Sequence, residues 1–165
     1  MANSSIIGKA KNKIIKELIK DIDIIQAIGD ENVTSLDNAE KLVNTRIFNY
    51  HQNPTTMNIV GTFITVQVHI PTSYYEDAAY VEPRVEIWII SHEKHMFVDN
   101  IPKVTENRND YLSKLIDKKL NGRLDIGVGE LKLESNIEGS YQKDYLYRQM
   151  TFKCKDLNKS LCSEE

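Results

Sequence analysis

The sequence contains few cysteines and no long hydrophobic segment. Only 2 of its 165 residues are cysteine, which is too few for a disulfide framework. Cys154 alternates with apolar residues, so we expect a small buried hydrophobe there, whereas Cys162 lies in a polar stretch. No apolar run approaches the roughly 18 residues that a membrane span needs, and Ile6-Ile7 is followed by lysines rather than by a signal-peptide core. We therefore expect a protein that is used without export and without a membrane partner.

The sequence also lacks a strong net charge and the common catalytic motifs. A formal net charge of −3 argues against a dedicated nucleic-acid binder, although it leaves room for a local basic patch. Neither the G-x-S-x-G nucleophile turn nor the G-x-x-x-x-G-K-[ST] phosphate loop occurs. The stretch "IGVGEL" lacks the third glycine of a dinucleotide-binding motif, so Gly127 and Gly129 are expected to mark a bend before a strand. We predict no enzymatic activity and no cofactor.

One short segment keeps a catalytic alternative open. The stretch "ISHEKHM" brings His92, Glu93 and His95 close together in the sequence. The zinc-protease motif H-E-x-x-H would need its second histidine one residue later. The preceding residues, 85–90, are β-branched and aromatic, which is typical of a strand, and a strand would direct the two histidines to opposite sides. We favour a strand that ends in a polar turn, and a metal-dependent hydrolase that uses these three residues is the alternative.

The N-terminal segment has a helical pattern. Residues 5–28 repeat apolar side chains at spacings of three and four, which predicts one amphipathic helix. Ser4 or Ser5 is a suitable N-cap, and Gly29 is a suitable stop. The lysines lie mostly off the apolar stripe. We expect them to form a solvated face, and contact with anionic lipid or nucleic acid is the alternative.

Two further helices are predicted downstream. A short one spans residues 35–42, with Ser35 as its N-cap. The other runs from about Asp110 to Leu120 and carries an apolar stripe at helical spacing. Asn107 or Asn109 can cap its start, and the Asn121-Gly122 pair ends it.

Alternating patterns predict the strands. Residues 58–70 have one apolar face and one more polar face, which places His69 on the solvent side of a sheet with one buried face. Residues 85–91 form the next strand. Two later strands surround a turn that we predict at 136–140, where Gly139 lies.

The order of these elements indicates the fold class. Helices precede, separate and flank the strands, which favours an α+β fold. We predict an antiparallel or mixed sheet of about four strands with two or three packed helices. We expect a single domain over residues 1–158, beginning with the amphipathic helix, and a polar tail over residues 159–165.

The segment between the first two strands is a candidate contact surface. The stretch "PTSYYEDAAYVEP", residues 71–83, is too long for a tight hairpin turn. It carries Tyr74, Tyr75 and Tyr80, and aromatic residues on a long loop favour contact with a partner. The alternative is a loop that folds back on its own sheet.

Arg148 is the second candidate interface residue. It shares a parity with the apolar residues of the last strand, and a charge that faces a core must be paired. We predict a structural or interfacial role for Arg148, with Glu134 or Glu138 across the hairpin as its partner.

Four stretches of the chain follow one another in a recognisable order. They are "TRIFNYHQNP" leading into "GTFITVQVHIP", then "VEIWIISHEK", "NRNDYLSKLIDKKLNG" and "GVGELKLESNIEGSYQKDYLYRQMTFKCKDLN". In this order the chain resembles the tail-terminator and neck (head-tail joining) proteins of long-tailed bacteriophages. The end of the last stretch resembles the aromatic-Arg-x-x-x-F-x-x-x-D-x-N close of such proteins. Tyr147 departs from the pattern, since a glycine often precedes the arginine there.

The resemblance implies a structural virion protein. Tail terminators form rings, usually homohexamers, that stop growth of the tail tube and join it to the neck. The implied partners are further copies of the chain, the tail tube protein and neck or connector proteins, and DNA passes through the lumen without specific binding. The implied location is the tail or neck of the virion, after assembly in the host cytoplasm. Another neck or head-completion ring protein is the alternative within the same class.

Overall fold

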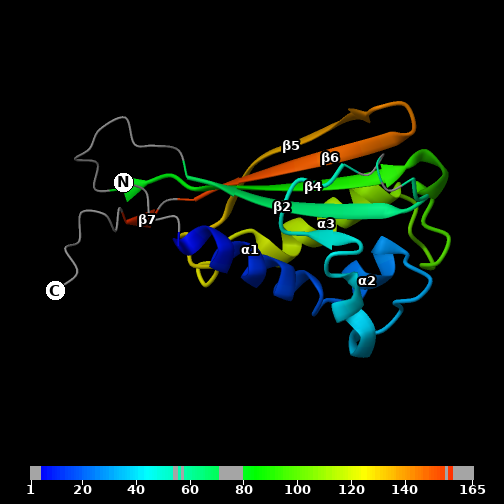
Figure 1. The fold of residues 1–165 in the computed structure, drawn as a ribbon, viewed down its shortest axis with the longest axis horizontal. Coiled ribbons are helices and arrows are strands. Elements are labelled where there is room, and N and C mark those ends of the chain that lie inside the picture. The colour runs from blue at the N-terminus through cyan, green and yellow to red at the C-terminus, as the bar shows by residue number, and fades with distance from the viewer. Residues whose placement is uncertain (1–4, 54–55, 57, 71–79, 155, 158–165) are drawn as a thin grey trace.

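The computed structural model describes residues 5–53, 56, 58–70, 80–154 and 156–157. A five-stranded sheet forms one layer and helices form the other (Figure 1). The strands, in order across the sheet, are β1 (Ile47–Phe48), β2 (Thr62–His69), β4 (Arg84–His92), β6 (Tyr145–Lys153) and β5 (Lys132–Tyr141). β1 runs parallel to β2, whereas the other neighbouring pairs of this sheet are antiparallel.

The remaining elements complete an α+β domain. A separate two-stranded sheet joins β3 (Tyr80–Val81) to β7 (Asp156–Leu157). The helices are α1 (Ser5–Leu18), α2 (Ile22–Ile28) and α3 (Arg108–Leu120), with the 3₁₀ helices η1 (Leu36–Leu42) and η3 (Glu93–His95). The predicted α+β class with a mixed sheet is confirmed, and the main sheet has one strand more than expected. Among the described residues, no helix combines the length and the apolar content that crossing a bilayer requires.

The N-terminal helical segment is broken. We predicted one helix over residues 5–28, which is wrong, because α1 and α2 are separated by a turn. Asp21 in that turn has extended backbone, and its carboxylate accepts hydrogen bonds from the backbone N–H groups of Asp23 (3.1 Å) and Ile24 (3.4 Å). This is an N-cap, and an N-cap starts a new helix. The break lets α1 pack on β2 while α2 packs on α3. The predicted stop at Gly29 is confirmed by its φ of 67°.

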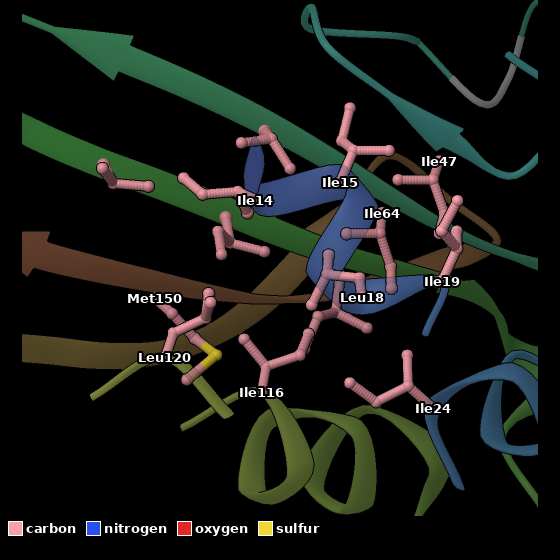
Figure 2. Close-up of a cluster of buried hydrophobic side chains, with 14 of the residues drawn as sticks. Ile14, Ile15, Leu18, Ile19, Ile24, Ile47, Ile64, Ile116, Leu120 and Met150 are labelled. Atoms are coloured by element: carbon pink, nitrogen blue, oxygen red, sulfur yellow. The ribbon is translucent and has the colours of Figure 1, made fainter. Parts of the chain in front are cut away.

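The main core lies between the helices and the inner face of the sheet. Figure 2 shows Ile14 and Leu18 of α1 beside Ile64 of β2, with Ile116 of α3 and Met150 of β6 around them. All five side chains are fully buried, and each such burial stabilises the fold by roughly 1.5–3 kcal/mol. The core therefore ties α1, α3 and the sheet into one unit. The prediction that Cys154 is a buried hydrophobe is confirmed, and Cys162 lies outside the described residues.

A second, smaller apolar cluster covers part of the opposite face of the sheet. It consists of Phe48, Phe63, Ile90 and Tyr145, with Trp88, Tyr141 and Tyr147 packed against it. The prediction that β2 buries only one face is therefore wrong for its first half, where successive residues are all buried. The prediction for His69 is confirmed: it is exposed, and its Nε2 lies 3.7 Å from a carboxylate oxygen of Glu86.

The β5–β6 hairpin differs from its prediction in the position of the turn. We predicted a turn over residues 136–140, which is wrong, because β5 continues to Tyr141. Gly139 does not form a turn; its lack of a side chain leaves room for the ring of Tyr147. A Cβ atom at this position would lie 2.7 Å from the ring of Tyr147 on the neighbouring strand, closer than side chains tolerate. The chain reverses at residues 142–144, where Gln142 has a φ of 60°.

The other predicted helices are confirmed with small changes. Residues 36–42 form the 3₁₀ helix η1 after an extended Ser35. α3 begins at Arg108 rather than near residue 110. Asn107 is its N-cap, since its side-chain oxygen accepts a hydrogen bond from the Asp110 N–H at 2.9 Å. Asn109, the other proposed cap, is instead buried inside the helix.

Candidate assembly interface

The predicted tyrosine surface lies mainly outside the described residues. Tyr74 and Tyr75 fall within residues 71–79, which the structure does not describe. Tyr80 belongs to β3, where its backbone pairs with Leu157 of β7. This pairing makes the end of the predicted loop part of a small sheet. The role of the three tyrosines as a contact surface stays a prediction.

Arg148 is held in a network of three acceptors. Its Nε donates to Asp110 Oδ1 at 2.8 Å, and its terminal nitrogens donate to Asn136 Oδ1 and Glu138 Oε2, both at 3.1 Å. The side chain is 17% exposed, which leaves it half-buried rather than in the core. Glu138 was one of the two predicted partners and is confirmed, whereas Glu134 does not pair with it in the described structure.

The contact between Arg148 and Asp110 escaped sequence analysis. The two residues are 38 positions apart, and only the packing of α3 against β6 brings them together. One local signal was present: Asp110 lies in the first turn of a helix, where a carboxylate is stabilised by the helix dipole. That signal explains why an acidic residue lies at the start of the helix, but it does not identify Arg148 as the residue that binds it.

An open hollow of about 420 Å³ lies beside this network, between the start of α3 and the hairpin. Leu146, Tyr147 and Met96 supply apolar surface, and Arg148 closes one side. No histidine or cysteine lines the hollow among the residues that the structure describes. Its mixture of apolar and hydrogen-bonding groups is suited to contact with another protein surface.

The histidine segment builds local structure. His92 caps η3, because its Nδ1 accepts a hydrogen bond from the Lys94 N–H at 3.1 Å, and its ring lies 5.1 Å from the ring of Tyr145. His95 points elsewhere and places its Nδ1 2.8 Å from Thr62 Oγ1. Within the described part of the chain, no three His, Cys, Asp or Glu side chains gather into a possible metal site. The strand that ends in a polar turn is the interpretation that this geometry supports.

Burial governs the charge of His95. Burial, together with the positive charges of Arg108 and Arg46, lowers the pKa of the imidazole from 6.5 to about 4. The ring is therefore neutral at pH 7. A neutral, hydrogen-bonded ring in this position acts as a packing element between β2 and the loop that follows η3.

A buried hydroxyl network lies next to His95. Ser91 Oγ lies 2.8 Å from Thr62 Oγ1 and donates to Asn109 Oδ1 at 2.6 Å. Asn109 in turn donates to the backbone carbonyl of Leu146 at 3.1 Å. The network joins β2, β4, α3 and β6. Because Ser91 is fully buried, its hydroxyl has no access to a substrate, and the network stabilises the fold.

Arg108 is a structural residue that sequence analysis missed. It is 2% exposed, and its guanidinium donates to three backbone carbonyls, those of His95 (2.7 Å), Ala27 (2.7 Å) and Phe97 (2.5 Å). The carbonyl of Ala27 belongs to the end of α2, where helix carbonyls lack partners. Arg108 therefore fixes the loop after η3 against α2.

The outer face of the sheet carries an aromatic cluster that includes His51. The rings of Trp88 and Tyr147 make a tilted contact with centroids 4.8 Å apart, and His51 lies edge-on to Trp88 at 5.8 Å. Trp88 Nε1 is buried without a hydrogen-bond partner among the described residues. Ile137 is exposed on the same face of the hairpin, opposite Gln149. This face offers a second surface with the composition of a protein contact.

Comparison with known proteins gives one family match and a similar solved structure. A family model named YomW matches residues 12–154, which include nearly all of the described elements. The chain belongs to the YomW family. No curated protein matches it. Among solved structures, a chain of the virion of a native gene transfer agent particle has a TM-score of 0.55 and 12% sequence identity. The similarity covers 86% of the YomW-family chain and 90% of the virion chain, and at this identity it establishes a shared fold.

Proposed function

We propose that this chain is a tail terminator, a structural protein of a tailed-phage virion whose copies form a ring at the end of the tail tube. The observation that carries the proposal is the likeness to a virion chain, because it covers nearly the whole length of both proteins. YomW is a phage-associated family, which agrees with it. The order of the four sequence stretches that resemble tail terminators and neck proteins favours this position in the virion.

The surfaces of the chain are suited to assembly. A ring subunit needs two different patches that meet head to tail and close the circle. The hollow beside Arg148, which the edge strand β5 borders through Glu138, Gly139 and Ser140, and the aromatic outer face of the sheet are two candidate patches. A net charge of −3 suits a lumen through which DNA slides, because phosphate binding requires concentrated lysine and arginine. In this proposal the copies form a homohexamer that contacts the tail tube and the neck proteins.

The first test is the assembly state of the purified chain. Native mass spectrometry and class averages from negative-stain electron microscopy would measure the number of copies. A closed ring supports the proposal, and a hexamer supports its finer form. A chain that stays monomeric at high concentration, both alone and with tail tube protein, contradicts it.

The second test separates a terminator from another ring of the neck. Purified tail tube protein polymerises into tubes whose length is measured by electron microscopy, with and without this chain. A terminator stops growth and decorates one tube end. A neck or head-completion ring leaves tube length unchanged, and phage that lack it should accumulate full-length tails and filled heads that fail to join.

A further inference from the structure

Phe97 is the most exposed large hydrophobic residue that the structure describes. Its side chain is 86% exposed, on the loop that joins η3 to α3. A single exposed apolar residue is ordinary. Phe97 differs because of how its backbone is held.

Hydrogen bonds to Arg108 and to α2 hold the backbone of the loop that carries Phe97. The guanidinium of Arg108 donates to the backbone carbonyls of His95 and Phe97. The backbone N–H of Arg108 donates to the carbonyl of Met96, which lies between them, at 2.8 Å. Asn100 donates to the carbonyl of Gln26 at 2.7 Å, which ties the same loop to α2. A side chain presented on a fixed backbone loses little entropy on binding, so the aromatic ring is pre-organised for insertion into a partner.

A complementary apolar groove lies elsewhere on the same chain. It has a volume of about 280 Å³ and runs between α1 and η1, with Ile19, Ala39 and Leu36 along it. Leu36 is 52% exposed in the isolated chain. The loop with Phe97 joins β4 to α3 at one end of the sheet, whereas α1 runs under the other half (Figure 1). The groove and the loop share no residue, and Phe97 is exposed rather than seated in the groove of its own chain.

The charges around the two patches are complementary. Lys16 on α1 and Lys20 in the turn after α1 border the groove on one side, and Glu40 borders it on η1. Near Phe97, Asp99 is almost fully exposed, and Lys94 is exposed on η3. Asp99 can therefore meet the two lysines of a neighbouring copy while Lys94 meets its Glu40. Opposite charges at the rim of an apolar contact select the partner and its orientation.

We propose that Phe97 of one copy inserts into the groove between α1 and η1 of the next copy, with Asp99 placed against Lys16 and Lys20. The occupant of the groove is thus a second copy of this chain, bound head to tail. The proposal rests on the ring of the proposed function and specifies its subunit contact. A buried aromatic anchor surrounded by charged residues is the usual form of a binding hot spot.

The test replaces the anchor and, as a control, another exposed apolar residue. Phe97→Ser should raise the dissociation constant between copies by about 30-fold or more. Leu124→Ser is the matched control, since Leu124 is 72% exposed, lies in the loop between α3 and β5 and does not line the groove. It should leave the assembly state unchanged. Analytical ultracentrifugation measures the assembly, and the melting temperature shows that each variant is folded.

The groove and the charges are tested separately. Leu36→Asp, in the groove, should weaken assembly as Phe97→Ser does. Lys20→Glu should also weaken it, and combining Lys20→Glu with Asp99→Lys in one chain should restore it. Restoration by the double variant supports direct contact between Asp99 and Lys20 in different copies. Two single variants that weaken assembly without restoration in the double variant overturn this pairing.

The failure of this inference is distinguishable from the failure of the proposed function. If the parent chain forms rings and Phe97→Ser forms them equally well, the contact lies elsewhere and the terminator proposal stands. If the parent chain self-associates neither alone nor with tail tube protein, both fail. If Phe97→Ser keeps the ring but no longer stops tube growth, Phe97 binds another virion protein, and the inference of a second copy is overturned.

Discussion

Arg148 on β6 donates from Nε to the Oδ1 atom of Asp110 on α3 at 2.8 Å, which fastens the start of α3 to the hairpin. Both side chains are partly open to water, so the pair is worth less than a buried ion pair. The contact also shapes the hollow beside α3, since both residues line it. Its two members can be changed independently.

Arg148→Ala should lower the free energy of unfolding by about 1–2 kcal/mol, because it removes hydrogen bonds between charged groups and leaves Asp110 without its cationic partner. Asp110→Asn should cost a similar amount. Glu138→Gln is the control, with a change near zero, because Glu138 is well exposed. Urea unfolding measures all three. An unchanged stability of Arg148→Ala would show that water replaces the network without loss.

Gly29→Ala should destabilise the fold more than Gly122→Ala. Both glycines have positive φ, 67° and 81°, which costs a residue with a Cβ about 1–2 kcal/mol. At Gly29 the new Cβ would also lie 2.5 Å from a terminal nitrogen of Arg108, whereas nothing lies within 4 Å at Gly122. The difference in melting temperature between the two variants measures how rigidly Arg108 is held. Equal effects would mean that the Arg108 side chain moves aside.

His95 should make the stability depend on pH. Its pKa is about 4 in the folded chain and near 6.5 when unfolded, so between these values the unfolded chain binds a proton that the folded chain does not. Stability should therefore fall as pH falls from 6.5 to 4, by on the order of 2 kcal/mol, and the loss should level off below pH 4. The variant His95→Gln should lack this component. An NMR titration that places the His95 pKa near 6.5 would contradict the burial argument.

Zinc should not stabilise the protein. His92 and His95 are engaged with Lys94 and Thr62, and they are not gathered around a common point with other ligands in the described structure. The melting temperature of untagged protein should stay the same with equimolar zinc or with a chelator. A rise of several degrees with zinc, lost in His92→Ala, would revive the metal-hydrolase alternative.

Replacing Tyr74, Tyr75 and Tyr80 by serine should leave the fold intact and weaken assembly. Tyrosine provides a large contact area at low entropic cost, which favours interfaces. Circular dichroism and the melting temperature measure the fold, and size-exclusion chromatography with electron microscopy measures assembly. If the triple variant assembles like the parent, these tyrosines do not form a subunit contact.

Much of the fold was determined by local sequence. The cap at Asn107, the stop at Gly29 and the alternation along β4 depend on neighbouring residues and the backbone, so patterns over a few positions were sufficient. The α+β class followed from the order of these elements. The same local rules failed where two patterns coexisted: the apolar stripe of residues 5–28 continues through Asp21, but the cap that Asp21 forms ends it as a single helix.

The candidate interface was decided by tertiary structure. Whether Gly139 turns the chain or admits the ring of Tyr147 depends on which residue of β6 lies opposite, and one position of register changes the answer. In the sequence, Arg108 is an ordinary charged residue at the start of a helix. Its structural role depends on the backbone carbonyls of α2 and of His95, which only the folded chain brings to its guanidinium. Composition and spacing describe what a residue can do, whereas its partners are set by packing between segments that are distant in the chain. For this protein the local sequence determined most of the elements, and only their packing placed Phe97 on a fixed loop and formed the groove between α1 and η1.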